Sequence, residues 1–150
     1  MSTALHPSLD RLTWILENLP AKLAAIPEEQ WSFKSSPEKW SRKEILGHLI
    51  DSAANNHQRF VRIQFECTPT IRYQQNDWNY YSYHQLQETK LLIDTWKQYN
   101  LFLKGILQHL PASALNREGI GGEGVPFTLD YIVEDYVNHM EHHLRQIVEY

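Results

Sequence analysis

The stretch WSRKEILGHLIDSAANNHQRF, residues 40–60, decides the fold class of this chain. Ser41 is followed three residues later by Glu44, which is the capping-box pattern with which many helices begin. On a helix of 3.6 residues per turn, one face of the segment is largely apolar. That face is formed by Leu46, Leu49, Ala53, His57 and Phe60. The stretch therefore predicts an amphipathic helix that starts after Ser41 and continues to about Glu66.

Three further segments show the same helical spacing of apolar residues. The first spans about residues 8–25 and contains Pro20, which we expect to kink the helix or to end its first half. Another spans about residues 82–110 and stops before Pro111, and the last begins at Thr128 as N-cap and runs to the C-terminus. Because no segment alternates convincingly with period two, we predict an all-α four-helix bundle.

The connections between these helices, residues 27–40, 67–81 and 111–127, are long for tight hairpins. They leave room for a crossover between two parallel neighbours, and hence for an up-down-down-up order. The third connection contains GIGGEGVPF, residues 119–127. It follows a helix and lacks the Gly-Lys-Ser/Thr ending of a phosphate-binding loop, so we interpret it as a flexible loop.

Length and charge narrow the class of protein. The 150 residues carry 14 basic and 18 acidic side chains, which gives a formal net charge of −4 without a basic cluster. We therefore expect one domain over residues 1–150 and no nucleic-acid partner. The sequence contains neither a secretory leader nor a membrane-spanning stretch, so we expect a soluble, cytoplasmic protein. The single cysteine, Cys67, permits no internal disulfide and is interpreted as a loop thiol.

A cluster of histidines lies in YVNHMEHHLRQI, residues 136–147. On a helical wheel His139 and His143 stand on or beside the buried face, whereas His142 faces away. Two imidazoles at positions i and i+4 of one helix can bind a single metal ion. The spacing also arises by chance, so a histidine stripe without a metal remains open at this point.

The helix that begins after Ser41 offers a third donor on a polar strip beside its apolar face. The strip contains His48, Ser52, Asn56 and Arg59. It borders either an internal cavity or solvent. His48 lies seven residues after Ser41 and His143 seven residues before Tyr150, about 10.5 Å in each case at 1.5 Å per residue. If the two helices run antiparallel, which requires the crossover, His48 and His143 lie level.

The remaining candidates near His48 have weaker patterns. His57 is about 13 Å along the helix from His48, and we interpret it as a core or interface side chain. Asp51, one turn from His48, could orient an imidazole, but its direction on the wheel favours a solvated carboxylate. We expect no functional partner for His84, and we expect His109 to interact with the end of its helix.

These two histidine-bearing stretches, together with IPEEQWSFKSSPEKW at residues 26–40, resemble the DinB-like superfamily, especially its YfiT-type metal-dependent branch. The resemblance covers most of the chain. It implies an up-down-down-up bundle in which His48, His139 and His143 bind a divalent metal ion, usually zinc or nickel. It also implies a homodimer, because many relatives are dimeric. It is specific for the fold and the metal site, and it says less about the reaction.

Three neutral imidazoles leave at least one coordination position open, which is typical of catalytic metal sites. We therefore expect an enzyme that acts on a small molecule. It would either activate water for hydrolysis or hold a low-molecular-weight thiol cosubstrate for transfer to an electrophile. The superfamily contains thiol-dependent enzymes, and YfiT-like members are usually described as hydrolases. Ser52, Asn56 and Arg59 would then contact an anionic substrate group. The alternatives are a metal-binding or sensor module without turnover, and a bundle without metal.

Overall fold

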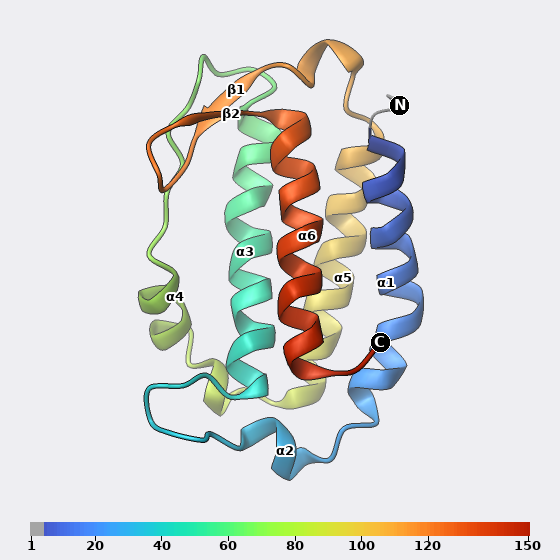
Figure 1. Cartoon of the computed structure of the whole chain (residues 1–150), viewed down its shortest axis with the longest axis vertical. Helices are drawn as coiled ribbons and strands as arrows, with labels where there is room; N and C mark the ends of the chain where they lie inside the picture. Colours follow the sequence, from blue (N-terminus) through green and yellow to red (C-terminus); the bar gives the residue numbers. More distant parts are fainter. Residues whose placement is uncertain (1–4) are drawn as a thin grey trace.

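Four long helices form the body of the molecule (Figure 1). They are α1 (His6–Ala24), α3 (Arg42–Arg62), α5 (Thr89–Gln108) and α6 (Leu129–Ile147). The computed structural model describes residues 5–150, and residues 1–4 lie outside the described part. In Figure 1, α1 and α6 run downward while α3 and α5 run upward. Reversing the view turns this order into up-down-down-up, so the predicted all-α four-helix bundle is confirmed.

The start of α3 follows the predicted capping box. The Ser41 hydroxyl accepts a hydrogen bond from the Glu44 amide at 3.2 Å, and the Glu44 carboxylate accepts one from the Ser41 amide at 3.1 Å. The apolar faces of the helices meet in a core with Trp31, Phe60 and Trp96 among its fully buried side chains. No helix within residues 5–150 is both long enough and apolar enough to cross a membrane.

Helix α1 continues through Pro20 to Ala24, close to its predicted end at residue 25, because the buried Leu19 and Leu23 hold its last turn against the core. Three other helix boundaries differ from those predicted. The helix expected to reach about Glu66 ends at Arg62. The helix expected from residue 82 starts at Thr89, since Tyr83 has a positive φ of 55° and a 3-10 turn follows it. The last helix ends at Ile147, short of the C-terminus.

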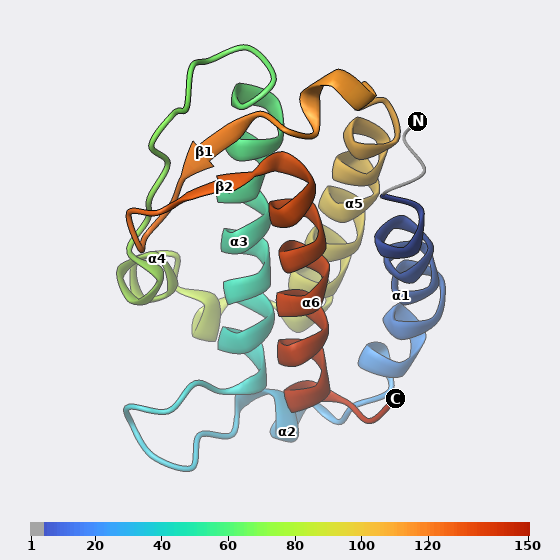
Figure 2. The ribbon, with the colours of Figure 1, turned by 45° about the horizontal axis from the view of Figure 1, so that its top comes forward.

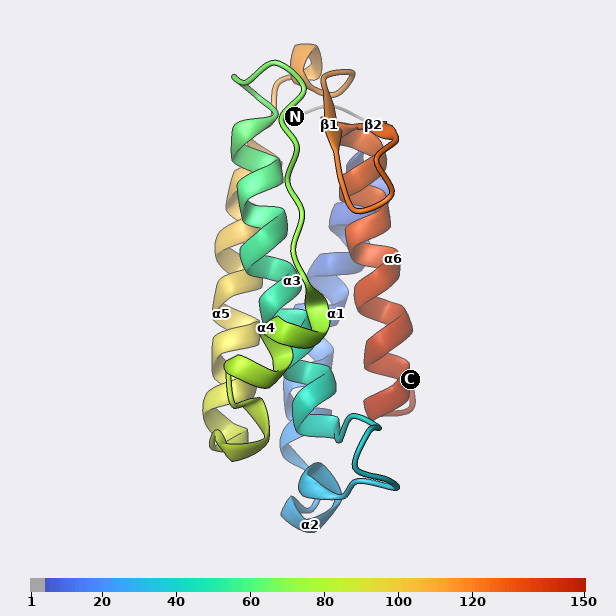
Figure 3. The same cartoon turned by 90° about the vertical axis from the view of Figure 1, so that its left-hand side faces the viewer.

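The connections contain structure that the sequence analysis missed. A short helix, α2 (Glu28–Ser32), follows α1, and α4 (Gln75–Tyr81) lies within the crossover from α3 to α5. Figure 3 shows the crossover descending along the outside of α3 from its upper to its lower end. This connection makes α3 and α5 parallel, and it leaves α3 and α6 antiparallel.

The glycine-rich third connection is a β-hairpin, so the prediction of a flexible loop is wrong (Figure 2). Strands β1 (Glu118–Ile120) and β2 (Pro126–Thr128) pair antiparallel, with Ile120 opposite Pro126. The crossover adds to this sheet, because the Ile71 amide donates to the Ile120 carbonyl at 2.8 Å. This third pairing partner, 49 positions upstream, stabilises strands that are too short to show a period-two pattern.

Candidate metal centre

The structure brings together the three histidines that the sequence selected. His48 comes from α3, and His139 and His143 come from consecutive turns of α6. One ring nitrogen from each residue lies within 4.8 Å of the other two. The ring centroids are 4.6–5.0 Å apart. Because α3 and α6 are antiparallel, the two helices present these side chains at the same level of the bundle.

The spacing of the ring nitrogens fits a shared metal ion. The Nε2 atoms of His48 and His139 are 3.2 Å apart. Two nitrogens that bind a tetrahedral zinc ion at 2.0–2.1 Å lie about 3.3 Å from one another. The widest separation in the cluster, up to 4.8 Å, would have to shorten toward this value on metal binding. Within residues 5–150 the cluster contains three candidate ligands and no fourth.

Burial keeps these imidazoles neutral. Desolvation, reinforced by the neighbouring histidines, lowers the pKa of His48 to about 3 and that of His139 to about 4. Burial also lowers the pKa of His143, against a hydrogen bond with Gln146 that raises it. A metal ion binds the neutral ring, so the donors are in the binding form at neutral pH.

Different contacts hold the rings of His143 and His48 in place. The Gln146 side-chain oxygen lies 2.9 Å from Nδ1 of His143, which leaves Nε2 of that ring free for a ligand. The His48 ring packs against Trp40 at a centroid distance of 5.0 Å. Nδ1 of His48 is buried and has no hydrogen-bond partner among the residues described. His142, predicted to face away, is exposed at the edge of the cluster.

The predicted polar strip lines a cavity next to the histidines. This inner cavity, of about 140 Å³, is bounded by Ser52, Asn56, Arg59, Tyr73, Asp135, Tyr136 and His139. Ser52 and Asn56 are buried, and the Asn56 amide donates to the Ser52 carbonyl at 2.9 Å. Arg59 donates to the Asn56 side chain at 3.2 Å and to the Ile71 carbonyl at 3.0 Å. The strip therefore borders a partly open cavity and is not a solvated flank.

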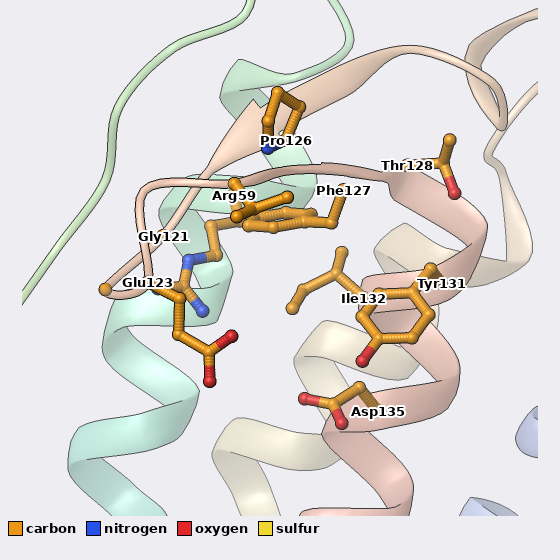
Figure 4. Close-up of a pocket in the computed structure, with 11 residues that line it drawn as sticks. Arg59, Gly121, Glu123, Pro126, Phe127, Thr128, Tyr131, Ile132 and Asp135 are labelled. Carbon is orange, nitrogen blue, oxygen red and sulfur yellow. The ribbon is translucent and has the colours of Figure 1, made fainter.

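A larger groove continues from the inner cavity toward the hairpin (Figure 4). This outer groove has a volume of about 630 Å³ and lies between α6 and the β1–β2 hairpin. Arg59 and Asp135 border both spaces. A small molecule that enters from the groove would thus pass between these two side chains on its way to His139.

The sequence profile of the DinB superfamily matches residues 9–147. The chain belongs to the DinB superfamily. The match includes His48, His139 and His143 and the cavity beside them. A search of curated protein sequences finds no match for this DinB-superfamily chain.

Solved structures of other proteins share the fold. YfiT from Bacillus subtilis, described as "a probable metal-dependent hydrolase with an unusual four-helix bundle topology", aligns with a TM-score of 0.79 and 23% identity. The alignment covers 93% of this chain and 83% of YfiT. A mycothiol-dependent maleylpyruvate isomerase aligns with a TM-score of 0.76 and 12% identity, over 96% of this chain. This chain spans 62% of the isomerase.

A buried pair on the other side of His48 was missed by the sequence analysis. Asp51 was expected in solvent and His84 without a partner, but both are buried, and Nε2 of His84 lies 3.0 Å from each Asp51 carboxylate oxygen. The two residues are 33 positions apart and meet only because the crossover returns along α3. Gly47 in the middle of a helix was the available signal, because the His84 ring occupies the space beside it.

The other histidines of this DinB-superfamily chain behave much as predicted. His57 is half-buried, and its Nδ1 lies 2.8 Å from the Tyr99 hydroxyl. His109 reaches the Gly105 carbonyl near the end of α5 at 2.7 Å. Cys67 is exposed in the connection after α3. None of these three belongs to the metal-binding cluster.

Proposed function

We propose that this protein is a metal-dependent enzyme that acts on a small molecule, with hydrolysis as its reaction. Zinc or nickel would be held by His48, His139 and His143. The observation that carries the proposal is the cluster of three imidazoles, of which His139 borders a cavity lined by polar side chains. A divalent ion with three imidazole ligands and an open position acidifies bound water toward neutral pH or keeps a thiol as thiolate.

The cavity favours an enzyme over a metal-binding or sensor module. A structural site is closed by a fourth protein ligand or by packing, whereas a catalytic site keeps one position accessible. Here His139 borders the inner cavity, and that cavity adjoins a groove of about 630 Å³. Such a volume matches the usual size of small-molecule sites.

The polar strip gives the substrate an orientation. Arg59 carries five N–H donors, and two protein acceptors use only part of them. We assign to Arg59 the binding of an anionic substrate group. The Asn56 side chain accepts a hydrogen bond from the Arg59 guanidinium and donates one to the Ser52 carbonyl, so Asn56 and Ser52 position Arg59. An anionic group bound by Arg59 would then lie in the cavity that His139 borders, with the rest of the substrate in the groove.

Transfer of a low-molecular-weight thiol is the second candidate reaction. It is supported by the structural similarity to the mycothiol-dependent isomerase, and it needs the same three ligands. The groove is large enough for both a thiol cosubstrate and an electrophile. Hydrolysis is preferred because YfiT aligns at higher identity and over more of its own length.

The test begins with elemental analysis of the purified protein and of two variants. His48→Ala removes a metal ligand and should lower metal affinity by more than about 100-fold. Loss of a residue that only hydrogen-bonds to a metal ligand already lowers affinity by about 10–100-fold. His142→Ala is the matched control, because this exposed neighbour should leave binding unchanged. Equal metal content in wild type and His48→Ala would overturn the proposed centre.

A substrate panel then separates the reactions. Esters and amides are compared with thiol-linked electrophiles on the zinc- and nickel-loaded protein. Hydrolysis that is lost in His48→Ala supports the proposal, whereas activity confined to thiol-containing mixtures would establish the second candidate. Arg59→Gln should raise KM for anionic substrates and change KM little for neutral ones.

A further inference from the structure

The passage between the inner cavity and the outer groove is bordered by two opposite charges. Arg59 extends from α3 on one wall, and Asp135 extends from α6 on the facing wall (Figure 4). Both side chains line both spaces, so they define a neck on the route to His139. This neck lies beyond the three metal ligands and is a recognition element of its own.

The two charges face each other without pairing. No ion pair joins Asp135 to Arg59 or to another residue in the range 5–150. The hydrogen bonds of Arg59 go instead to Asn56 and Ile71. Arg59 is half-buried, whereas Asp135 is exposed to the groove. The two side chains extend from different helices into the same space, so a ligand that carries both charges would contact each of them.

Charged groups on both sides of the groove influence the pKa of Asp135. Partial desolvation raises the pKa of the Asp135 carboxyl, the positive charge of Arg59 lowers it, and Glu123 on the hairpin turn raises it. Glu123 also lines the outer groove. The rest of the groove near the neck is formed by apolar and aromatic groups of Phe127, Tyr131 and Ile132. The groove thus offers one guanidinium, two carboxylates and an apolar surface.

We propose that the neck binds a zwitterionic small molecule, with its carboxylate on Arg59 and its ammonium group on Asp135. The chemical class is an α-amino acid or a derivative that keeps both charges, with an apolar side chain against Phe127 and Tyr131. This assignment rests on the proposed function, because it names the substrate class of that site. The assignment goes beyond the proposed function because it adds Asp135, on the opposite helix, as a specificity-determining residue.

Three matched probes test the requirement for two charges. Leucine carries both groups, N-acetylleucine carries only the carboxylate, and leucinamide carries only the ammonium group at neutral pH. Dissociation constants are measured at pH 7 by titrating ¹⁵N-labelled protein and following amide shifts, with and without zinc. Leucine should bind about tenfold more tightly than either other probe, as expected for one additional charge-assisted hydrogen bond. The shifts should map to Gly121, Gly122 and Tyr131, which line the groove.

Two variants test which side chain binds the carboxylate of the ligand and which binds its ammonium group. Asp135→Asn should weaken leucine about tenfold and leave N-acetylleucine unchanged, while Arg59→Gln should weaken leucine and leave leucinamide unchanged. Glu134→Gln is the control, since Glu134 is exposed on the same helix and borders a different hollow. It should bind all three probes like the wild type.

The outcomes separate this proposal from the proposed function. Equal affinity for leucine and N-acetylleucine, no binding of any probe, or an unchanged preference in Asp135→Asn would overturn the zwitterion site. Metal content, measured on the same samples, reports on the metal centre alone. A protein that prefers leucine but binds no zinc would overturn the enzyme proposal while supporting the neck as a ligand site.

Discussion

Gly47 is the residue at which the crossover meets the metal-binding helix. A Cβ atom added there would lie 2.1 Å from Cγ of His84, well inside van der Waals contact. The His84 ring fills this space and reaches Asp51 one turn further along α3. A side chain at position 47 must therefore push the ring away from its carboxylate partner. The absence of a side chain at position 47 thus links His84, on the crossover, to the helix that carries His48.

We predict that Gly47→Ala destabilises the protein. Overpacking costs about 1–3 kcal/mol, and the buried Asp51 carboxylate loses its partner as the ring moves. The free energy of unfolding in urea measures the effect. Gly105→Ala in α5 is the control, because nothing lies within 4 Å of its added Cβ, and it should stabilise the protein by about 0.5–1 kcal/mol. Equal effects of the two substitutions would contradict the packing argument.

Single residues also mark the limit of what the sequence reveals about the site. His48, His139 and His143 could be selected because helix geometry places residues within one helix, and the family resemblance joined the two helices. The pairing of His84 with Asp51 depends on where the crossover runs, which no periodicity encodes. Asp135 lies one helical turn before His139, yet its position at the neck depends on the hairpin and on Arg59.

At the scale of elements, side-chain caps and long-range contacts determine how well each boundary could be predicted. The start of α3 was correct because Ser41 and Glu44 bond to each other's backbone within four residues. Thr128 does stand at the N-cap of α6, but its hydroxyl bonds to the Asp130 side chain and not to the helix backbone. The hairpin and α4 were missed because their short segments are stabilised by distant partners, Ile71 for the hairpin and the Glu44 carbonyl for Asn79 of α4.

The two caps should therefore differ in their contribution to stability. Ser41→Ala removes the bond to the Glu44 amide and a second bond to the Gln85 side chain, and we expect a loss of about 1–2 kcal/mol. Thr128→Ala removes no bond to the helix backbone and should cost less than about 0.5 kcal/mol. Urea unfolding of both variants measures the difference. If Thr128→Ala lowered the free energy of unfolding as much as Ser41→Ala, the hydrogen bonds to the helix backbone would not explain the effect of the N-cap residue, and the prediction would be wrong.

At the scale of the whole molecule, the antiparallel packing of α3 against α6 buries basic groups that are charged in the unfolded chain at acidic pH. The folded protein keeps His48 and His139 neutral down to pKa values of about 3 and 4, below their ordinary value of 6.5. Above pH 6.5 neither state protonates these residues, so their contribution to stability is complete. Below pH 6.5 only the unfolded chain takes up the protons, and acid therefore favours unfolding.

We predict that the metal-free protein loses stability between pH 6.5 and about pH 4. Each of the two histidines should lower the free energy of unfolding by up to about 1.4 kcal/mol per pH unit over this interval. Carboxylates also titrate there, so the measurement compares urea unfolding of wild type with His48→Gln. The variant should show a shallower pH dependence, whereas His142→Gln, which changes an exposed ring, should follow the wild type. Saturating zinc at 100 times its Kd should add about 2.7 kcal/mol at neutral pH to the wild type, and much less to His48→Gln. A pH dependence identical in wild type and His48→Gln would mean that the His48 ring is not held neutral by the bundle.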